Sequence, residues 1–395
     1  MKPRALMLLV ALAAGLFAVT VVVTRAFRAE QTQLARQWMD RGNAALAASQ
    51  PAVAVTAYRT ALLYAWNNKG YQFKLAQALA DAGKTDEAAA YFKNLWESEP
   101  GNAVVNLELA RLAVRKRDFN EAMRFFHAAI YGVWPDDPAT HRRRARREFI
   151  HFLLDFGATA QANAELIALE AELPSTGSAH KSAADLFMRV QDYSRALDEY
   201  RRAINLNRND ATALANAGRA AFELAQYGLA QQYLHKAVAH GIDDPSVAKL
   251  SGLVDAILVL DPDEPRLTNP ERRARVLRGF EQAKVRLQQC VAATGHPLVT
   301  GALPGSNGRV AGQSAASSSR LATPAAPMTE TQKEFAEWQQ LRPRISDLGL
   351  LRNPDLMDTA MDLIFRIERQ AGPQCGPPAT ADTALLELAR RHEGS

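Results

Sequence analysis

Small and apolar residues recur along residues 35–244 at a spacing that fits helices stacked in pairs. An alanine returns every 34 residues, with a single step of 40, and a large side chain follows it by four positions. Offsets of four and seven lie on one face of a helix. A period of 34 is typical of stacked helical hairpins, which share no single globular core. The six alanines are Ala54, Ala88, Ala122, Ala162, Ala196 and Ala230.

Each alanine is also preceded, twelve positions earlier, by a mostly small residue. A small side chain at a fixed place on the first helix of each pair lets two backbones approach closely. Ile150 is the exception, and the 40-residue step before Ala162 indicates about six inserted residues near 135–142. The set is Gly42, Ala76, Ala110, Ile150, Ala184 and Gly218.

This pattern resembles the tetratricopeptide repeat, whose signature contains Trp, Leu-Gly, Tyr, Ala, Phe or Tyr, Ala and Pro. The first repeat matches it at Trp38, Gly42, Ala54, Tyr58 and Ala61. The second repeat matches it at Leu75, Ala76, Ala88, Phe92 and Pro100. The resemblance implies an all-α, right-handed superhelical solenoid of six helix–turn–helix repeats over residues 35–244.

The N-terminus contains a stretch long enough to cross a membrane. Twenty residues from Ala5 to Thr24 carry no charge, and at about 1.5 Å per residue they span a hydrocarbon layer of roughly 30 Å. The residues that follow, Thr24 to Phe27, form a poor signal-peptidase site because Arg25 lies among them. We therefore expect residues 1–28 to form an uncleaved, single-pass anchor, with a cleaved signal peptide as the alternative.

The flanking charges leave the orientation of this anchor open. A short N-terminal tail with Lys2 and Arg4 favours export of the repeats, whereas Arg25, Arg28 and Arg36 favour the opposite side. The expectation adopted is a bacterial inner membrane protein with its repeats outside the cytoplasm.

Composition divides the chain after the repeats into three parts. Residues 245–292 read as a divergent terminal hairpin, in keeping with the atypical end repeats of solenoids. Residues 293–328 are rich in Gly, Ser, Ala and Pro and predict a disordered linker. Residues 329–395 read as a short helical tail, with helices expected near 329–341, 354–370 and 381–391.

The chain has two cysteines, one on each side of the linker. Cys290 and Cys375 would close a loop of about 86 residues in an oxidising compartment, whereas two unrelated free thiols are the alternative. Neither cysteine has a second cysteine or a histidine at ligand spacing, so the sequence predicts no metal site.

No catalytic or phosphate-binding motif stands out, so no enzyme activity and no cofactor are expected. The net charge of +5 is compatible with an acidic partner but does not require one. The basic run 141–147 lacks interleaved aromatic residues, so nucleic acid is not an expected partner. A solvated helix start is the simpler interpretation of that run.

The resemblance supplies a candidate binding surface, because the first helix of each tetratricopeptide repeat lines the concave groove. Basic residues with apolar anchors at such positions suit a peptide segment with acidic groups. The carboxylate clamp of some relatives is not expected, since Lys74, Val104 and Glu108 occupy its partner positions. The groove positions are Phe73, Leu107, Arg111, Arg144, Arg147, His151, Lys181, Met188, Arg189, Arg219 and Phe222.

The sequence thus favours a membrane-anchored interaction scaffold or assembly factor for other proteins, of open oligomeric state. A cytoplasm-facing adaptor that presents substrates to a membrane protease or regulator is the alternative. A catalytic tail is a third, which no motif supports.

Overall fold

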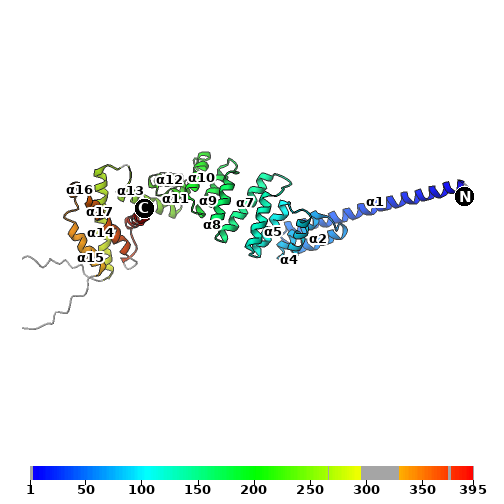
Figure 1. Ribbon diagram of the computed structural model, residues 1–395, viewed down its shortest axis with the longest axis horizontal. Helices are drawn as coiled ribbons and strands as arrows, with labels where there is room; N and C mark the ends of the chain where they lie inside the picture. Colours follow the sequence, from blue (N-terminus) through cyan, green and yellow to red (C-terminus); the bar gives the residue numbers. More distant parts are fainter. Residues whose placement is uncertain (1–2, 266, 295–328, 372–374, 395) are drawn as a thin grey trace, which may run out of the picture. The chain divides into compact units, whose positions relative to one another are not determined.

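The computed structural model describes residues 3–265, 267–294, 329–371 and 375–394 (Figure 1). Every named element in these ranges is a helix, which confirms the all-α class. Two compact units divide the chain, Met1–Ser175 and Thr176–Ser395. The linker expected at 293–328 lies almost wholly outside the described residues.

The first unit consists of eight helices that pair in chain order, so that it holds four repeats. α1 is one continuous helix that begins in the apolar N-terminal stretch and ends as the first helix of repeat 1 (Figure 1). The helices are α1 (Pro3–Ala47), α2 (Pro51–Tyr64), α3 (Lys69–Asp81), α4 (Thr85–Ser98), α5 (Ala103–Arg115), α6 (Phe119–Tyr131), α7 (Pro138–Asp155) and α8 (Thr159–Glu170).

The second unit begins with two further repeats and continues into the C-terminal helices. Its repeats are α9 (Gly177–Arg189) with α10 (Tyr193–Leu206), and α11 (Ala211–Glu223) with α12 (Tyr227–Ala239). The remaining helices are α13 (Pro245–Leu260), α14 (Asn269–Thr294), α15 (Glu330–Leu341), α16 (Asp347–Arg352), α17 (Asp355–Gln370) and α18 (Thr380–Gly394). The short helix α16 has no counterpart in the sequence-based prediction.

The periodic positions form the core of both units. All six repeat alanines are fully buried, and so are the large residues four positions later: Tyr58, Phe92, Phe126, Leu166, Tyr200 and Leu234. The small residues explain how closely the helices pack. A Cβ on Gly42 would lie 2.2 Å from the Tyr58 ring, and one on Gly218 would lie 2.7 Å from Cγ of Leu234. The helix pairing predicted from the sequence is therefore confirmed.

The turn between the two helices of each repeat has one repeated geometry. Its central residue has a left-handed backbone, with φ between 56° and 77°, and the next residue donates its N–H to the carbonyl five residues back. This is the Schellman ending of a helix, which favours glycine. The left-handed residues are Ser49, Gly83, Arg117, Gly157, Gln191 and Ala225.

The segment between α6 and α7 folds back onto the preceding repeat. Val133 pairs with the start of α5, since its N–H donates to Gly101 O at 2.9 Å and its carbonyl accepts from Ala103 N at 3.1 Å. Trp134 is buried and donates from Nε1 to Ala129 O at 3.1 Å. This segment is therefore an ordered part of repeat 3, and most of the residues expected as an insertion near 135–142 lengthen α7 at its start.

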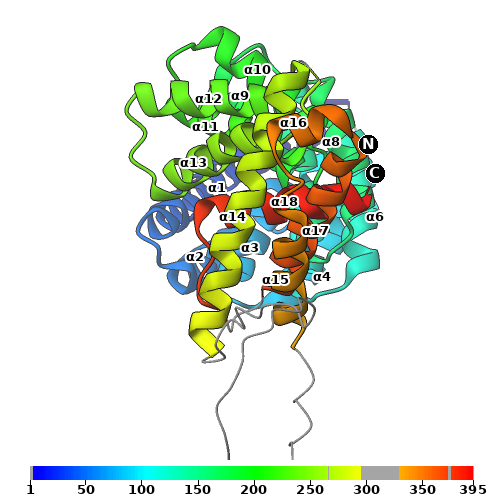
Figure 2. The ribbon, with the colours of Figure 1, turned by 90° about the vertical axis from the view of Figure 1, so that its left-hand side faces the viewer.

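The C-terminal helices form a bundle around α14. α15 and α17 lie beside α14 (Figure 2), and Trp338 stacks on Phe280 and donates to its carbonyl at 2.9 Å. α13, which the sequence pairs with the following helix, packs chiefly against α12 and α18. α14 packs against α15 and α17 instead, and α18, from the end of the chain, occupies the place beside α13 that was expected for α14.

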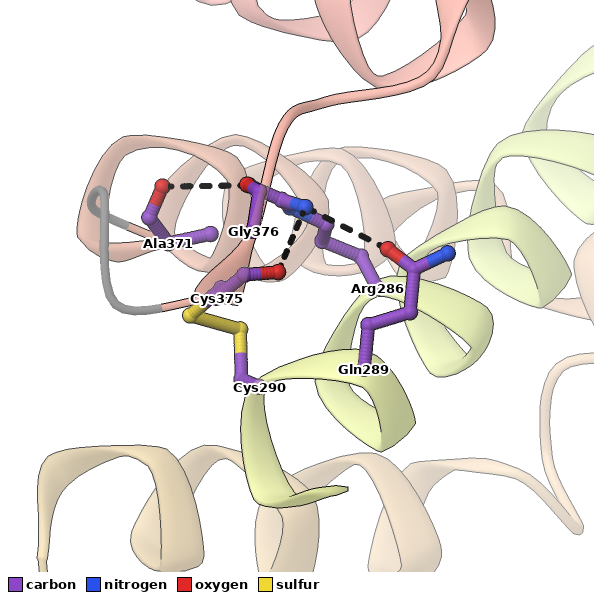
Figure 3. The surroundings of a disulfide bond; sticks show 6 residues. All are labelled: Arg286, Gln289, Cys290, Ala371, Cys375 and Gly376. Atoms are coloured by element: carbon purple, nitrogen blue, oxygen red, sulfur yellow. Dashed lines mark hydrogen bonds between the residues drawn. A yellow bond between two sulfur atoms is a disulfide. The ribbon is translucent and has the colours of Figure 1, made fainter. Parts of the chain in front are cut away.

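A disulfide bond joins α14 to the segment between α17 and α18. Cys290 is bonded to Cys375, and the buried Arg286 donates to the carbonyls of Ala371, Cys375 and Gly376 at 3.3–3.4 Å (Figure 3). These contacts hold the chain that leads into α18.

Candidate partner-binding surface

The apolar groove residues of the first unit contribute to packing. Leu107 is buried on α5, and the half-buried Phe73 on α3 meets the Phe92 ring edge-on at 5.5 Å between centroids. Part of the Phe73 side chain therefore remains accessible to a partner, whereas Leu107 belongs to the core.

Arg111 lies at its expected place on α5, but its charge is compensated within the repeats. It donates two hydrogen bonds to Glu148, at 2.7 and 2.9 Å, and a third to Glu108 at 2.9 Å. The bonds to Glu148 are the main reason that the pKa of Arg111 is raised. Glu108 also accepts from Gln77 at 3.1 Å, so α3, α5 and α7 are linked by one polar network.

The basic run at the start of α7 separates into packed and exposed arginines. Arg146 is buried and paired with Glu165 at 3.2 Å and Glu172 at 2.8 Å. Arg144 has two thirds of its side chain exposed and reaches Glu148 at 3.3 Å.

Arg147 is exposed, and within the part of the chain that the structure describes no ion pair to it is found. His151, one turn further along α7, is exposed as well.

Two of the predicted cations of the second unit bind the residue that caps the helix after the next one. Lys181 on α9 donates to Asp210, the N-cap of α11, at 2.9 Å. Arg219 on α11 donates to Asp244, the N-cap of α13, at 3.0 Å and to Ser246 at 2.7 Å. These cations therefore tie successive repeats together.

The other predicted residues of the second unit differ in their access to a partner. Arg189 is exposed and Met188 is half-buried. Phe222 is half-buried: the Arg391 guanidinium of the tail lies 5.7 Å from its ring centre, and Tyr227 of α12 meets it edge-on at 5.8 Å. Phe222 is thus engaged within the chain.

The acidic partners of these cations were not predicted from the sequence. Glu108 and Glu148 occupy equivalent positions in α5 and α7, three residues before Arg111 and four after Arg144 respectively. Asp210 and Asp244 stand just before the first helices of their repeats, where an N-cap is expected. Reading the acidic residues on the first helices together with the basic ones could have revealed this compensation.

A pocket of about 760 Å³ opens at the N-terminal ends of α3 and α5. Phe73, Val104 and Val133 are among its lining residues. Among the described residues, no group of three or more His, Cys, Asp or Glu side chains is placed to hold a metal ion.

The N-terminal helix has the composition of a membrane span. Over Leu12–Ala47 of α1, an 18-residue window reaches a mean hydropathy of 1.6 and is not buried against the rest of the chain. This is the one such helix among the described residues. Its length and composition permit membrane crossing.

Comparison with known proteins identifies the repeats. Residues 79–131 match a family model described as "Tetratricopeptide repeat". No curated protein sequence matches the chain.

Solved structures of helical repeat proteins are similar at low identity. YrrB, described as a tetratricopeptide repeat protein with an unusual peptide-binding site, is 17% identical over 49% of this chain and 95% of its own, with a TM-score of 0.37. PilW, described as a widely conserved type IV pilus biogenesis factor, is 19% identical over 56% of this chain and 97% of its own, also with a TM-score of 0.37.

A chain of the APC/C hetero-tetramer Cut9–Hcn1 is 14% identical over 57% of this chain, with a TM-score of 0.32. The match covers 46% of that chain, less than half of its length. Residues 79–131 are therefore similar to the tetratricopeptide repeat, and the same helix pairing and 34-residue period extend over residues 35–244. The helix that begins this series, α1, is also long and apolar enough to cross a membrane.

Proposed function

We propose that this chain is a membrane-anchored protein-interaction scaffold or assembly factor that binds peptide segments of other proteins on the first helices of its repeats. One observation carries the proposal. The periodic residues pack between the helices, while the side chains of Arg144 and Arg147 stay exposed on α7. These two arginines are available to a partner.

The exposed arginines favour a partner with acidic groups. Arg144 shares Glu148 with Arg111, so a carboxylate from a partner can bind Arg144 or Arg147 without breaking the Arg111 contacts. Arginine binds carboxylates through paired, charge-assisted hydrogen bonds. An acidic peptide is therefore the partner class that fits best.

Anchoring by α1 would raise the effective concentration of the repeats for partners in the same membrane. Confinement of this kind strengthens weak contacts without any new interaction. We place α1 in the inner membrane of a bacterium, with the repeats outside the cytoplasm. The Cys290–Cys375 disulfide supports that side, because such bonds persist in oxidising compartments.

Charge reversal tests the surface directly. Arg144→Glu with Arg147→Glu should lower the recovery of crosslinked partners from intact membranes roughly fivefold or more, since each exposed pair contributes up to about 1 kcal/mol. The matched control is Arg124→Glu with Arg201→Glu, two arginines on second helices whose side chains are 64% and 42% exposed. Equal recovery from both double variants would refute this surface.

The alternative is a cytoplasm-facing adaptor that presents substrates to a membrane protease or regulator. Arg25, Arg28 and Arg36 favour it, because positive charge after a membrane helix tends to remain in the cytoplasm. A reporter fused after Ser395 that is active only in the cytoplasm would establish the adaptor orientation. A reporter active only outside would establish export.

A further inference from the structure

The pocket between repeats 2 and 3 is built partly by the segment between α6 and α7. Its walls come from the N-terminal ends of α3 and α5, the end of α4 and this segment, which contributes Val133 and Pro135. The backbone hydrogen bonds of Val133 and the buried Trp134 hold this segment in place. One wall of the pocket therefore has a fixed backbone.

The walls of this pocket are mainly apolar. Leu95 and Val105 present buried surfaces, Phe73 is half-buried, and Val133 is 75% exposed although its backbone is held. Because the backbone of Val133 is already fixed, a contact with its side chain would require no further loss of backbone conformational entropy at this residue. The volume of about 760 Å³ lies in the range of ligand pockets and is ample for a bulky side chain.

Lys74, at the edge of the pocket, carries a positive charge that no carboxylate of the described residues neutralises. Lys69 is paired with Glu99 at 2.8 Å. Lys74 is exposed and its Nζ contacts the neutral Gln77 Oε1 at 3.3 Å, with no carboxylate partner among the described residues. A carboxylate beside the pocket would thus find a cation that nothing else neutralises.

We infer that this pocket binds a partner peptide in which a bulky apolar side chain, best an aromatic one, is adjacent to a carboxylate. The aromatic ring would lie against Phe73, Val105 and Val133, and the carboxylate would contact Lys74. This inference rests on the proposed function, since it names the peptide chemistry that one part of the repeats selects.

Short peptides serve as the probe, with the full chain in detergent. We compare the sequences Gly-Ser-Trp-Asp-Ser-Gly, Gly-Ser-Trp-Asn-Ser-Gly and Gly-Ser-Ala-Asp-Ser-Gly, blocked at both ends, by ligand-observed NMR. The Trp-Asp peptide should bind about two- to fivefold more tightly than Trp-Asn, the range of an exposed ion pair. The Ala-Asp peptide should show at least tenfold weaker binding, because it lacks the buried ring.

Two variants assign the binding to the pocket. Val133→Asp should weaken Trp-Asp binding at least tenfold, whereas Val53→Asp, at an exposed valine on α2, should leave it unchanged. Lys74→Gln should abolish the preference for Trp-Asp over Trp-Asn, and Lys93→Gln on α4 should retain it. Equal binding of the Trp-Asp and Ala-Asp peptides, or full binding by Val133→Asp, would overturn the inference.

The outcome is separable from that of the proposed function. If reversal of Arg144 and Arg147 leaves partner recovery intact while the peptides still bind in a Val133-dependent way, the α7 surface is wrong and the pocket stands. If the peptides fail to bind while reversal abolishes partner recovery, the pocket is wrong and the α7 surface stands.

Discussion

Arg391 on α18 donates a hydrogen bond of 2.7 Å to the carbonyl of Phe222, which lies 169 residues earlier at the end of α11. The same guanidinium lies 4.6 Å from the Tyr227 ring centre. One side chain of the tail thus satisfies a helix end of repeat 6 and covers two of its aromatic rings. The tail is an integral part of the second unit.

Loss of this side chain should free the tail from repeat 6. Arg391→Ala removes a charge-assisted hydrogen bond and a cation–π contact, so α18 should lose about 1–3 kcal/mol of protection in amide hydrogen exchange. Arg390→Ala is the control, because Arg390 is exposed and its ion pair with Glu387 is 3.7 Å long. Unchanged exchange of α18 in Arg391→Ala would show that packing against α13 and α17 holds the tail without this contact.

Two glycines 34 residues apart should respond to alanine in opposite ways. Gly218→Ala forces a methyl group against Leu234 and should lower the free energy of unfolding of the second unit by about 1–3 kcal/mol. A Cβ added to Gly252 on α13 would meet no atom within 4 Å, so Gly252→Ala should raise it by about 0.5–1 kcal/mol. Chemical denaturation of both variants measures the contrast; a loss of stability in each would disprove the open space at Gly252.

The disulfide should stabilise the C-terminal bundle. The two cysteines are separated by 85 residues, and closure of such a loop contributes roughly 4–5 kcal/mol in the chain-entropy account. Cys290→Ser with Cys375→Ser should lower the denaturant midpoint of the bundle to that of the reduced wild type. A reducing agent should then have no further effect on the double variant, and an effect of similar size on both proteins would exclude the disulfide as its cause.

The bundle should also lose stability as the pH rises. Burial raises the pKa of Glu368 to about 8, with Asp382 acting in the same direction and Arg286 opposing it. Between the unfolded pKa near 4.5 and the folded value, the unfolded chain releases the proton and the folded one retains it. The contribution of Glu368 to stability should therefore fall by up to about 1.4 kcal/mol per pH unit from about pH 5 to pH 8 and level off above.

Glu368→Gln should remove the contribution of Glu368. Glu334, whose pKa burial raises to about 7, contributes a slope of similar size below about pH 7, so the loss of slope should be clearest between pH 7 and pH 8. Asp358→Asn, at an exposed carboxylate of α17 in the same bundle, should keep the full slope. Thermal unfolding across this pH range would measure all three, and an unchanged slope in Glu368→Gln would locate the titrating group elsewhere.

The repeated core was predictable because its signal is local. Helix faces depend on offsets of four and seven, so Ala54 and Tyr58 identify a buried stripe without knowledge of distant residues. The turns carried a further signal: Gly83 and Gly157 occupy the left-handed position of their repeats, where Ala225 and Gln191 adopt the same conformation. Because these two glycines occupy the same position within the repeat, they could have located the turn in the other repeats as well.

The surface chemistry was less predictable because it depends on pairing between helices. Arg111 is compensated by Glu148, 37 residues away, and Lys181 by Asp210. Periodicity places each charge on a helix face but does not state which opposite charge lies across from it. The contact of α18 with α13 could not be predicted for the same reason, because the local sequence of either helix does not indicate its packing partner.

The unbroken course of α1 has a mechanical consequence. The first buried residue of the repeats, Ala35, follows Thr24 by eleven residues of the same helix, or about 16 Å. With α1 in a bilayer, no hinge would separate the lipid-embedded part from repeat 1. The orientation of the first unit and its distance from the lipid would then be set by the span itself. A rotation of that span about its axis would turn Arg147 and the pocket with it, through the same angle.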